Sequence, residues 1–396
     1  MHVKSCKFIE KQGDAMLLIK NGILHTMERR GVIQADLLAK NGKIVCISER
    51  IDPPESARIL DARGLHIYPG FIDAHSHIGI SEEKSGRPGD DCNETTNPVT
   101  PCLRAIDAIN PMDSAFHNAL AAGITGVMVG PGSANAVGGQ FAFIKTDGRR
   151  VDDRVVLAPA AMKIAFGENP KVSYGMNGNI PATRMAIASL IREELFLARQ
   201  YFDGEKNGGV QPDFGRECYR ALFEGKIPLK AHAHRTDDIF TAIRIAEEFG
   251  LGLTLDHCTE GHLIAGEIAA SGFPAIVGPS LASRSKIEVN QSDFKTAGVL
   301  DKAGVLVALT TDHPVSRIQY LPLCAALAAK EGMGEEAALR AITINAARIC
   351  RVDGRLGSLS EGKDADLALF DGNPLHVATT ALYTVVGGAV AYEARR

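Results

Sequence analysis

The sequence predicts an α/β protein built as a parallel barrel of the TIM type, with a small β-sandwich formed by both chain termini. Short strands and turns fill residues 16–68, strands alternate with helices over residues 71–345, and the strand-and-turn texture then returns. Repeated strand–helix alternation over such a length is typical of a barrel, whose active-site groups gather at the C-terminal ends of its strands. We expect a sandwich domain of residues 1–68 and 351–396 and a barrel domain of residues 69–350.

The N-terminal region is predicted to form short strands joined by turns. Residues 1–15 are polar and irregular, and we assign them no role. The expected strands are residues 16–20, 23–27, 36–40, 43–47, 57–61 and 65–68. Asn21-Gly22 and Asn41-Gly42 each separate two of these strands. Because Asn-Gly between apolar runs favours a tight turn, both dipeptides predict β-hairpins.

The central and C-terminal elements follow from periodicity and from start and stop signals. We expect strands at residues 126–129, 229–232, 253–257, 275–277 and 305–309, and strand-and-turn structure over residues 357–359, 362–370 and 382–388. We expect helices at residues 113–122, 184–202, 236–249 and 335–350. Asp113 and Thr236 are placed to cap two of these helices, and Gly123 and Gly250 follow them.

Composition limits the classes of partner. The 396-residue chain has a formal net charge of −4, which gives no indication of a nucleic-acid or anionic-membrane partner. We expect neither a membrane span nor a signal peptide, since the chain has no apolar run of about 18 residues and no basic-then-apolar N-terminus. The eight cysteines form no C-x-x-C pair, which predicts a reduced, cytoplasmic protein. The expected partner is a small-molecule substrate, and a homo-oligomer is left open.

The stretch from Tyr68 to His77 carries the first chemical signal. It leaves a Pro-Gly turn as an apolar run and ends in His75-Ser76-His77. Side chains two residues apart on a strand point to the same face, so His75 and His77 would project side by side. Two adjacent imidazoles suit one metal ion, although a solvated pair at a strand end would read the same way.

Further motifs follow in order along the chain. They are Pro69-Gly70-Phe71-Ile72-Asp73-Ala74-His75-Ser76-His77, Lys230-Ala231-His232-Ala233-His234, Asp256-His257, Thr310-Thr311-Asp312-His313-Pro314 and Gly362-Lys363-Asp364-Ala365-Asp366-Leu367. With them the chain resembles the amidohydrolase superfamily, in particular its imidazolonepropionase-like and metal-dependent dipeptidase-like branches. The resemblance covers nearly the whole chain. It implies a (β/α)8 barrel with a β-sandwich built from both termini.

The resemblance also implies a set of metal ligands. His75 and His77 would bind the first metal ion from strand 1. His232 would be the ligand on strand 5, and His257 the ligand on strand 6. Asp312, after strand 8, would both touch the metal and act as the catalytic base, passing a proton from the attacking water to the leaving nitrogen.

Two positions depart from this pattern or leave it open. His234 shares a face with His232, but an acid usually follows His-Ala in the family, so we expect a substrate contact or a residue behind the ligands rather than a ligand. A two-metal site needs an anionic bridge, which a carbamylated Lys163 would supply from an apolar run where a free ammonium is costly. Glu168 is the competing bridge, and the remaining alternative is that Lys163 extends to the surface.

Loops after the strands would shape the pocket. Residues 130–140 could present backbone N–H groups to an anionic substrate, or form only a tight turn. Residues 81–101 could act as a lid. Arg235 and Arg284 follow expected strands and could hold a substrate carboxylate. His313, directly after Asp312, is a further candidate substrate contact.

Together these features predict a metal-dependent hydrolase that cleaves a carbon–nitrogen bond in a cyclic amide or a dipeptide-like amide by attack of metal-bound hydroxide. The expected cofactor is a divalent metal, zinc before others, with one or two ions per chain. The nearest alternative is an aminohydrolase that deaminates a heterocycle. A further alternative is a non-catalytic assembly protein on the same fold.

Overall fold

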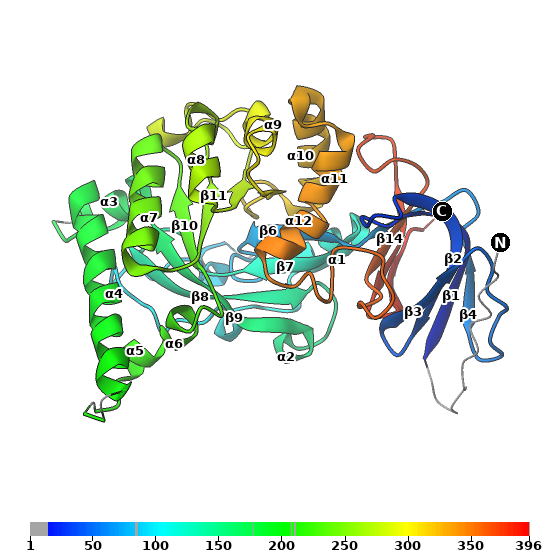
Figure 1. Ribbon diagram of the computed structural model, residues 1–396, viewed down its shortest axis with the longest axis horizontal. Coiled ribbons are helices and arrows are strands. Elements are labelled where there is room, and N and C mark those ends of the chain that lie inside the picture. The colour runs from blue at the N-terminus through cyan, green and yellow to red at the C-terminus, as the bar shows by residue number, and fades with distance from the viewer. Residues whose placement is uncertain (1–14, 84–85, 177, 207, 210, 396) are drawn as a thin grey trace.

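The protein has two parts that lie side by side, a barrel with its helices and a smaller sheet of terminal strands (Figure 1). The structure is a computed structural model, and it describes residues 15–83, 86–176, 178–206, 208–209 and 211–395. Within these residues the strands form two hydrogen-bonded sheets of eight strands each. The expected fold class, an α/β barrel with a β-structure built from both termini, is confirmed.

Strands from both ends of the chain form the first sheet. Its strands are β1 (Met16–His25), β2 (Val32–Lys40), β3 (Lys43–Ser48), β4 (Arg58–Asp61), β5 (His66–Pro69), β14 (Leu367–Phe370), β15 (Ala381–Val386) and β16 (Ala389–Glu393). The order is β16-β15-β14-β5-β1-β2-β3, with β4 pairing with β1. The N-terminal and C-terminal strands meet where β14 lies antiparallel to β5. Apolar side chains from most of these strands pack into one buried cluster, which holds the two chain ends together.

Only one of the two predicted hairpins forms. Asn41-Gly42 joins β2 to β3 with φ values of 48° and 80°, as a tight hairpin turn requires. Asn21-Gly22 instead lies inside the continuous strand β1, where the pairing with β2 shifts register, so that hairpin prediction is wrong. Asn21 has φ 61°, and a positive φ at this residue serves a bulge as well as a turn.

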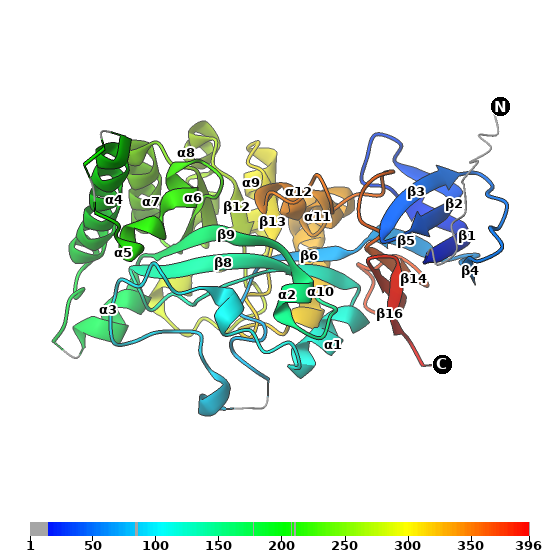
Figure 2. The same cartoon turned by 90° about the horizontal axis from the view of Figure 1, so that it is seen from below.

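The second sheet is the barrel. Its strands are β6 (Phe71–Ser76), β7 (Ile124–Val129), β8 (Val137–Lys145), β9 (Val155–Ala165), β10 (Leu229–Ala233), β11 (Leu253–His257), β12 (Ala275–Val277) and β13 (Val307–Leu309), in sequential order. Strand β8 runs antiparallel to both β7 and β9, and the other neighbouring pairs are parallel. The connection from β7 to β8 is too short for a crossover helix, which explains this departure from strict strand–helix alternation. Figure 2 shows β8 and β9 running side by side along the barrel.

Helices follow most of the other strands. They are α1 (Ser114–Ala121), α2 (Val151–Arg154), α3 (Glu168–Gly175), α4 (Arg184–Lys206), α5 (Phe214–Glu217), α6 (Arg220–Phe223), α7 (Thr236–Phe249), α8 (Ala265–Ser271), α9 (Lys295–Lys302), α10 (Leu321–Ala328), α11 (Glu335–Ala341) and α12 (Ile344–Ile349), with shorter helical turns η1 (Arg87–Gly89), η2 (Ala105–Asp107), η3 (Gly261–Leu263), η4 (Ile287–Val289), η5 (Ile318–Tyr320) and η6 (Ala329–Met333).

Two helix predictions need correction. Thr236 is the first residue of α7 rather than its cap, and its N–H donates to Glu260 Oε2 at 2.8 Å. The helix expected at residues 335–350 is broken into α11 and α12 at Thr343, which leaves the helical region with φ −133° and ψ −102°. The predicted Asp113 cap is confirmed, since its side chain accepts a hydrogen bond from the Ala115 N–H.

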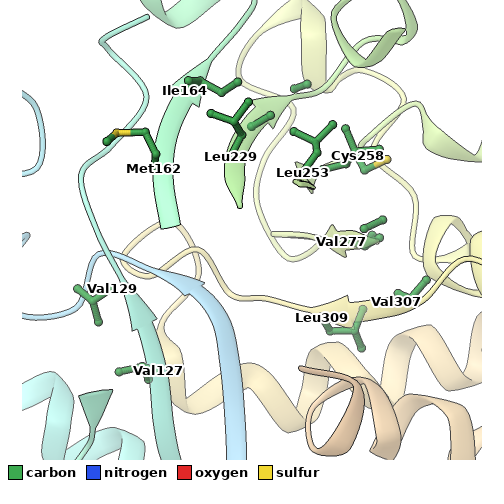
Figure 3. Close-up of a cluster of buried hydrophobic side chains, with 14 of the residues drawn as sticks. Val127, Val129, Met162, Ile164, Leu229, Leu253, Cys258, Val277, Val307 and Leu309 are labelled. Carbon is green, nitrogen blue, oxygen red and sulfur yellow. The ribbon is translucent and has the colours of Figure 1, made fainter. Parts of the chain in front are cut away.

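Alternating side chains separate the outside of the barrel from its axis. The main buried cluster takes its members from positions two apart along the strands, such as Met162 and Ile164 of β9, and Leu229 of β10 beside Leu253 of β11 (Figure 3). The residues between them, such as Lys163 and Lys230, belong to the opposite face, toward the barrel axis. This alternation brings polar side chains to the interior of the barrel.

The two parts meet at a glycine and a lysine. Gly70 lies between β5 and β6, and a Cβ there would lie 2.0 Å from Thr125 Oγ1, so only glycine fits. Lys145, at the end of β8, reaches across to the terminal sheet, with Nζ 2.9 Å from Asp364 Oδ2 and 2.8 Å from Asp366 Oδ1. The chain connection at Gly70 and the ion pairs of Lys145 therefore both join the barrel to the terminal sheet, and the Thr384 hydroxyl of β15 adds a hydrogen bond to the Leu120 carbonyl of α1.

The lengths of the helices and the state of the cysteines complete the description of the fold. Across the described ranges, every helix is too short or too polar to cross a membrane. Free thiols belong to Cys92, Cys102, Cys218, Cys258, Cys324 and Cys350.

Candidate metal centre

A cavity of about 310 Å³ opens at the C-terminal ends of the barrel strands. Sequence-predicted site residues that line it are His75, His77, Lys163, His232, His234, His257 and Asp312. They come from β6, β9, β10 and β11 and from the segments that follow β6, β10 and β13. The structure thus brings together side chains that lie up to 237 residues apart in the chain, at the end of the barrel where such folds place their chemistry.

The first group of candidate ligands is His75, His77 and Asp312, whose ligand atoms all lie within 4.8 Å of one another. Asp312 Oδ1 is 3.5 Å from His75 Nε2 and 3.2 Å from His77 Nε2. His77 Nδ1–H donates to the Gly130 carbonyl at 2.7 Å, which turns its Nε2 toward the carboxylate. Burial opposes a charge on His77, but Cys92 and Asp312 outweigh it and raise its pKa to about 10.

A buried carboxylate supports His75 from behind. Asp256 Oδ2 lies 2.9 Å from His75 Nδ1, although the two atoms do not form a well-directed hydrogen bond. The other oxygen of Asp256 accepts hydrogen bonds from Lys230 Nζ at 3.1 Å and from Thr254 Oγ1 at 3.2 Å. A carboxylate behind an imidazole sets the ring orientation and leaves the second nitrogen for a metal.

The second group is His232, His234 and Glu288, with the same 4.8 Å limit between ligand atoms. Glu288 lies in η4, after β12, and its side chain is 1% exposed. Glu288 Oε1 is 3.9 Å from His232 Nε2 and 3.8 Å from His234 Nε2. His257 lies between the two groups, with ring centroids 5.0 Å from His75 and 4.5 Å from His232.

Lys163 is fully buried on β9 and faces the cavity. Its Nζ has no hydrogen-bond partner and lies 5.5 Å from the centroid of the Phe141 ring. Burial lowers the pKa of Lys163 to about 8, against an opposing attraction from Asp256. A lysine with a lowered pKa is more often neutral than a surface lysine, and a neutral amine is the form that reacts with carbon dioxide to give a carbamate.

Buried polar atoms without a hydrogen-bond partner show whether the cavity could hold a metal ion. The buried atoms without a hydrogen-bond partner include His75 Nε2, His232 Nδ1, His257 Nε2, Lys163 Nζ and Asp312 Oδ1. Each such atom costs about 1 to 3 kcal/mol if nothing binds it. Because all of them belong to side chains that line one cavity, imidazole nitrogens and a carboxylate oxygen are available together, and this is the donor set that zinc prefers.

The charge states of His232, His234, His257 and Asp312 also suit metal binding. Burial lowers the pKa of His232 and of His257 well below the usual range for histidine, and lowers that of His234 to about 3. These rings are therefore neutral and keep a lone pair. Burial alone would raise the pKa of Asp312, but His257 and His77 outweigh it and hold the pKa below its usual value. Asp312 is therefore an ionised acceptor.

Backbone strain is concentrated at the same place. His257, Cys258 and Asp312 have φ values of 70°, 48° and 52°. Positive φ is uncommon outside glycine and costs free energy, so it persists only where surrounding contacts enforce it. At Asp312 the backbone N–H donates to Thr310 Oγ1 at 3.0 Å. Strain at two of the candidate ligands is consistent with a functional site.

The cavity lining does not include four other predicted site residues, which are Arg235, Arg284, Glu168 and His313. Arg235 is partly exposed and pairs with Asp237. The Arg284 guanidinium donates to the Ser292 carbonyl. Glu168 contributes its backbone N–H, which donates to Glu288 Oε2 at 2.8 Å.

His313 is buried, and its Nδ1 accepts a hydrogen bond from the Ile318 N–H. The cation that does line the cavity is Lys286. Ser81, Asp90, Cys92 and Asn93, from the segment expected to act as a lid, also line it. In the loop expected at residues 130–140, the last four residues belong to β8.

Four residues that build the site were not among those predicted from the sequence. Glu288 and Lys286 lie on an irregular loop, and no spacing pattern connects them to the histidines. Asp256 and Lys230 were part of the motifs but received no role. A usable signal was present for these two, since a charged residue between apolar neighbours on a buried strand must have a partner.

The fold and the site define the class of protein: an α/β barrel that carries histidine and carboxylate ligand groups at the C-terminal ends of its strands. The chain belongs to the amidohydrolase family, whose sequence profile matches residues 66–392. The profile covers the whole barrel and reaches into the terminal sheet at both ends.

Individual relatives agree with this assignment. The chain is 28% identical over 431 residues to amidohydrolase tasK of Hapsidospora irregularis, an alignment that covers 96% of this chain but spans only 44% of that relative. It is 26% identical over 369 residues to an imidazolonepropionase of Rhizorhabdus wittichii, covering 86% of this chain and 89% of that protein. The crystal structure of an amidohydrolase from Thermotoga maritima superposes with a TM-score of 0.92 at 40% identity, covering 96% of this chain and all of that one.

Proposed function

We propose that this protein is a metal-dependent hydrolase that cleaves the carbon–nitrogen bond of a small cyclic or dipeptide-like amide. The observation that carries the proposal is the pair of three-ligand groups, five of whose six residues line one cavity at the C-terminal ends of the barrel strands. Membership of the amidohydrolase family supports an enzyme acting on carbon–nitrogen bonds. The imidazolonepropionase relative supports a cyclic amide, because its name states that it acts on an imidazolone ring.

A divalent metal ion, zinc before others, would polarise the amide carbonyl and lower the pKa of a water molecule. His75, His77 and Asp312 would hold it, with the Nε2 atoms and the carboxylate already turned toward one another. Lys163, carbamylated, is the proposed bridge to a second ion. The side chain of Lys163 lines the cavity, whereas Glu168 is engaged through its backbone with Glu288.

Asp312 is the proposed proton carrier. Its carboxylate is ionised, and Oδ1 has no hydrogen-bond donor. It would accept a proton from the attacking water and release it to the nitrogen that leaves, which is the general-base and general-acid role of one group in two steps. The Asp312 backbone, held by Thr310, keeps the carboxylate aimed at His75 and His77.

The cavity favours a small, polar substrate. A volume of about 310 Å³ is at the lower end for ligand pockets. Ser133, Asn169, Thr259, Ser285 and Lys286 provide hydroxyl, amide and ammonium groups along its wall. These groups can pair with carbonyl and carboxylate oxygens of an amide substrate.

Turnover of a substrate panel tests the proposal. Metal-loaded protein would be offered lactams and imidazolones, dipeptides and aminated heterocycles, with ring opening followed by mass (a gain of one water) and deamination followed by ammonia release. We expect hydrolysis of an amide without ammonia release, and its loss on treatment with a chelator. Ammonia release from a heterocycle alone would identify the protein as a deaminase instead, and inactivity of fully metal-loaded protein on the whole panel would support a non-catalytic role.

A further inference from the structure

We propose that Cys102 and Cys218 form a redox-active dithiol, which hydrogen peroxide converts to a disulfide between residues 90–102 and helix α5. The two cysteines lie outside the candidate metal centre, and neither belongs to the lining of its cavity. The proposal therefore does not depend on hydrolase activity.

The two thiols share one hydrogen-bond acceptor. Cys102 Sγ donates to the Phe214 carbonyl at 3.6 Å, and Cys218 Sγ donates to the same oxygen at 3.1 Å. The thiols also interact with each other, since a hydrogen bond with Cys102 contributes to a raised pKa of Cys218. Both cysteines are free. Two thiols from distant parts of the chain thus meet around one oxygen at the start of α5.

Gln140 of β8 holds both of the segments that carry these cysteines. Its backbone N–H donates to the Leu103 carbonyl at 2.7 Å, and its side-chain amide donates to the Cys218 carbonyl at 3.1 Å. Figure 2 shows α5 near the end of β8 that lies away from the terminal sheet. Because a disulfide forms only within a narrow range of backbone separations, a common anchor next to both sulfurs favours this pairing.

Cys102 is accessible to a small oxidant. It is partly exposed and lines a second cavity of about 430 Å³, together with Cys92 and Arg104. Cys218 is 9% exposed. Burial raises the pKa of Cys218 to about 12, against an opposing effect of Arg104, so Cys218 remains a thiol. We therefore assign the first reaction with peroxide to Cys102 and the second step to Cys218.

The oxidation proceeds in two balanced steps. The Cys102 thiolate attacks one oxygen of hydrogen peroxide, so an S–O bond forms and the O–O bond breaks. The leaving hydroxide combines with the proton that Cys102 released, which gives water. The Cys218 sulfur then attacks the sulfenic acid, so the S–S bond forms and the S–O bond breaks, and the Cys218 proton leaves with the hydroxyl group as a second water. The two thiols lose two electrons in total, and the peroxide gains them.

The disulfide would constrain the wall between two cavities. Asp90, Cys92 and Asn93 line both the candidate metal cavity and the second cavity. Residues 93–101 connect this wall to Cys102. A covalent link from Cys102 to α5 should therefore slow the opening of the segment and the hydrogen exchange of its backbone.

Oxidation of the intact chain tests the dithiol. Reduced protein would be treated with a small excess of hydrogen peroxide, its thiols counted under denaturing conditions and its disulfides located by peptide mass spectrometry. We expect a peptide that links Cys102 to Cys218, with both thiols restored by dithiothreitol. Hydrogen exchange over residues 90–101 should be slower in the oxidised protein. Its melting temperature should rise by several degrees, because the link closes a long loop.

Substitution of single cysteines identifies the partners. Cys102→Ser and Cys218→Ser should each abolish the linked peptide and the rise in melting temperature, and Cys218→Ala provides a second replacement at the buried position. Cys92→Ser is the matched control, because Cys92 lines the same cavity as Cys102 and is the alternative partner. This control should form the link as the unmodified chain does. Melting of each reduced variant would show that it folds.

Four outcomes would overturn the proposal. They are the absence of the linked peptide, a link from Cys102 to Cys92 in its place, a link between two copies of the chain, seen as a dimer on a non-reducing gel, and unchanged hydrogen exchange over residues 90–101 in fully oxidised protein. These measurements need no substrate, so their result is independent of the turnover panel.

Discussion

Asp73 of β6 accepts two hydrogen bonds from Thr311, one from its hydroxyl at 2.5 Å and one from its backbone N–H at 3.1 Å. The Thr310 hydroxyl, which carries a single proton, lies within hydrogen-bond distance of two further acceptors, Asp73 Oδ1 and the His75 carbonyl. In the hydrogen-bonded strand order, β6 and β13 are the two ends of the barrel sheet. Among the described strands, β6 and β13 are not paired through backbone hydrogen bonds. The Asp73 carboxylate therefore joins these two strands through its hydrogen bonds to Thr311.

Replacing Thr311 by valine tests this closure. Thr311→Val keeps the shape but removes one donor from a fully buried carboxylate, and should lower the free energy of unfolding by about 1 to 3 kcal/mol. Urea denaturation followed by circular dichroism would measure it. Thr241→Val, on the outer face of α7, should change stability by less than about 0.5 kcal/mol. Equal stability of the two variants would mean that Asp73 does not hold the barrel closed.

Asp256→Asn should weaken metal binding at the first group. The replacement puts an amide in place of the oxygen that faces His75 Nδ1, so the ring is no longer held against a carboxylate. Loss of such a partner typically lowers metal affinity by about 10- to 100-fold. Competition with a chromogenic chelator would measure it. Asp113→Asn, which alters a buried helix cap away from the cavity, should retain the original affinity, and an equal loss there would point to a general effect on folding.

Asp312→Asn should abolish most of the hydrolysis found in the substrate panel. An amide at this position can neither accept the proton of the attacking water nor carry it to the leaving nitrogen, and kcat should fall by about 10²- to 10⁴-fold. Steady-state kinetics at saturating metal would measure the change. Asp237→Asn, which weakens ion pairs with Arg235 and Arg184 outside the cavity lining, should keep its kcat. An active Asp312→Asn enzyme would require a different proton carrier.

Asp364 should make stability depend on pH at the acidic end. Burial alone would raise the pKa of this carboxyl, but Arg355, Lys43 and Lys145 outweigh it and hold the pKa well below its usual range. Its folded-state pKa is thus below the unfolded value of about 3.9. The stabilisation is complete above that value and is lost as pH falls from it toward the folded pKa.

Unfolding midpoints at pH 7 and near pH 3 would measure this effect. Asp364→Asn should be less stable at pH 7 by about 1 to 3 kcal/mol, because the buried end of Lys145 loses one of its two carboxylates. The difference between variant and unmodified protein should shrink at the acidic pH. A difference that stays constant between the two pH values would contradict the assignment to this carboxylate.

Strands buried on both faces were the most predictable part of the fold. β11 and β12 match the expected ranges, because an apolar run of this length between turn signals admits few other structures. The prediction failed where one local signal serves two structures. Asn21 has the positive φ that a hairpin turn would use, but the chain continues straight because strand β2 pairs with β1 on both sides of the bulge.

The candidate site likewise contains residues that could be predicted from the sequence and residues that could not. His75, His232 and Asp312 could be placed in advance because each follows or ends a barrel strand, and the barrel brings strand ends together. Glu288 could not, because it lies on an irregular loop after β12, and only the three-dimensional path of that loop brings it to His234. Arg284 was selected as the cation after this strand, yet the loop turns Lys286 inward and Arg284 outward.

Strand β8 extends from the terminal sheet to the candidate metal centre. At one end Lys145 is tied to Asp364 and Asp366, and at the other end a Cβ on Gly138 would lie 3.1 Å from Lys163 Cγ. A single paired strand thus acts as a rigid rod between the two ends of the molecule. Truncating the chain to its barrel would release one end of that rod, so the terminal strands serve as an anchor for the position of Lys163 as well as a cover for the barrel.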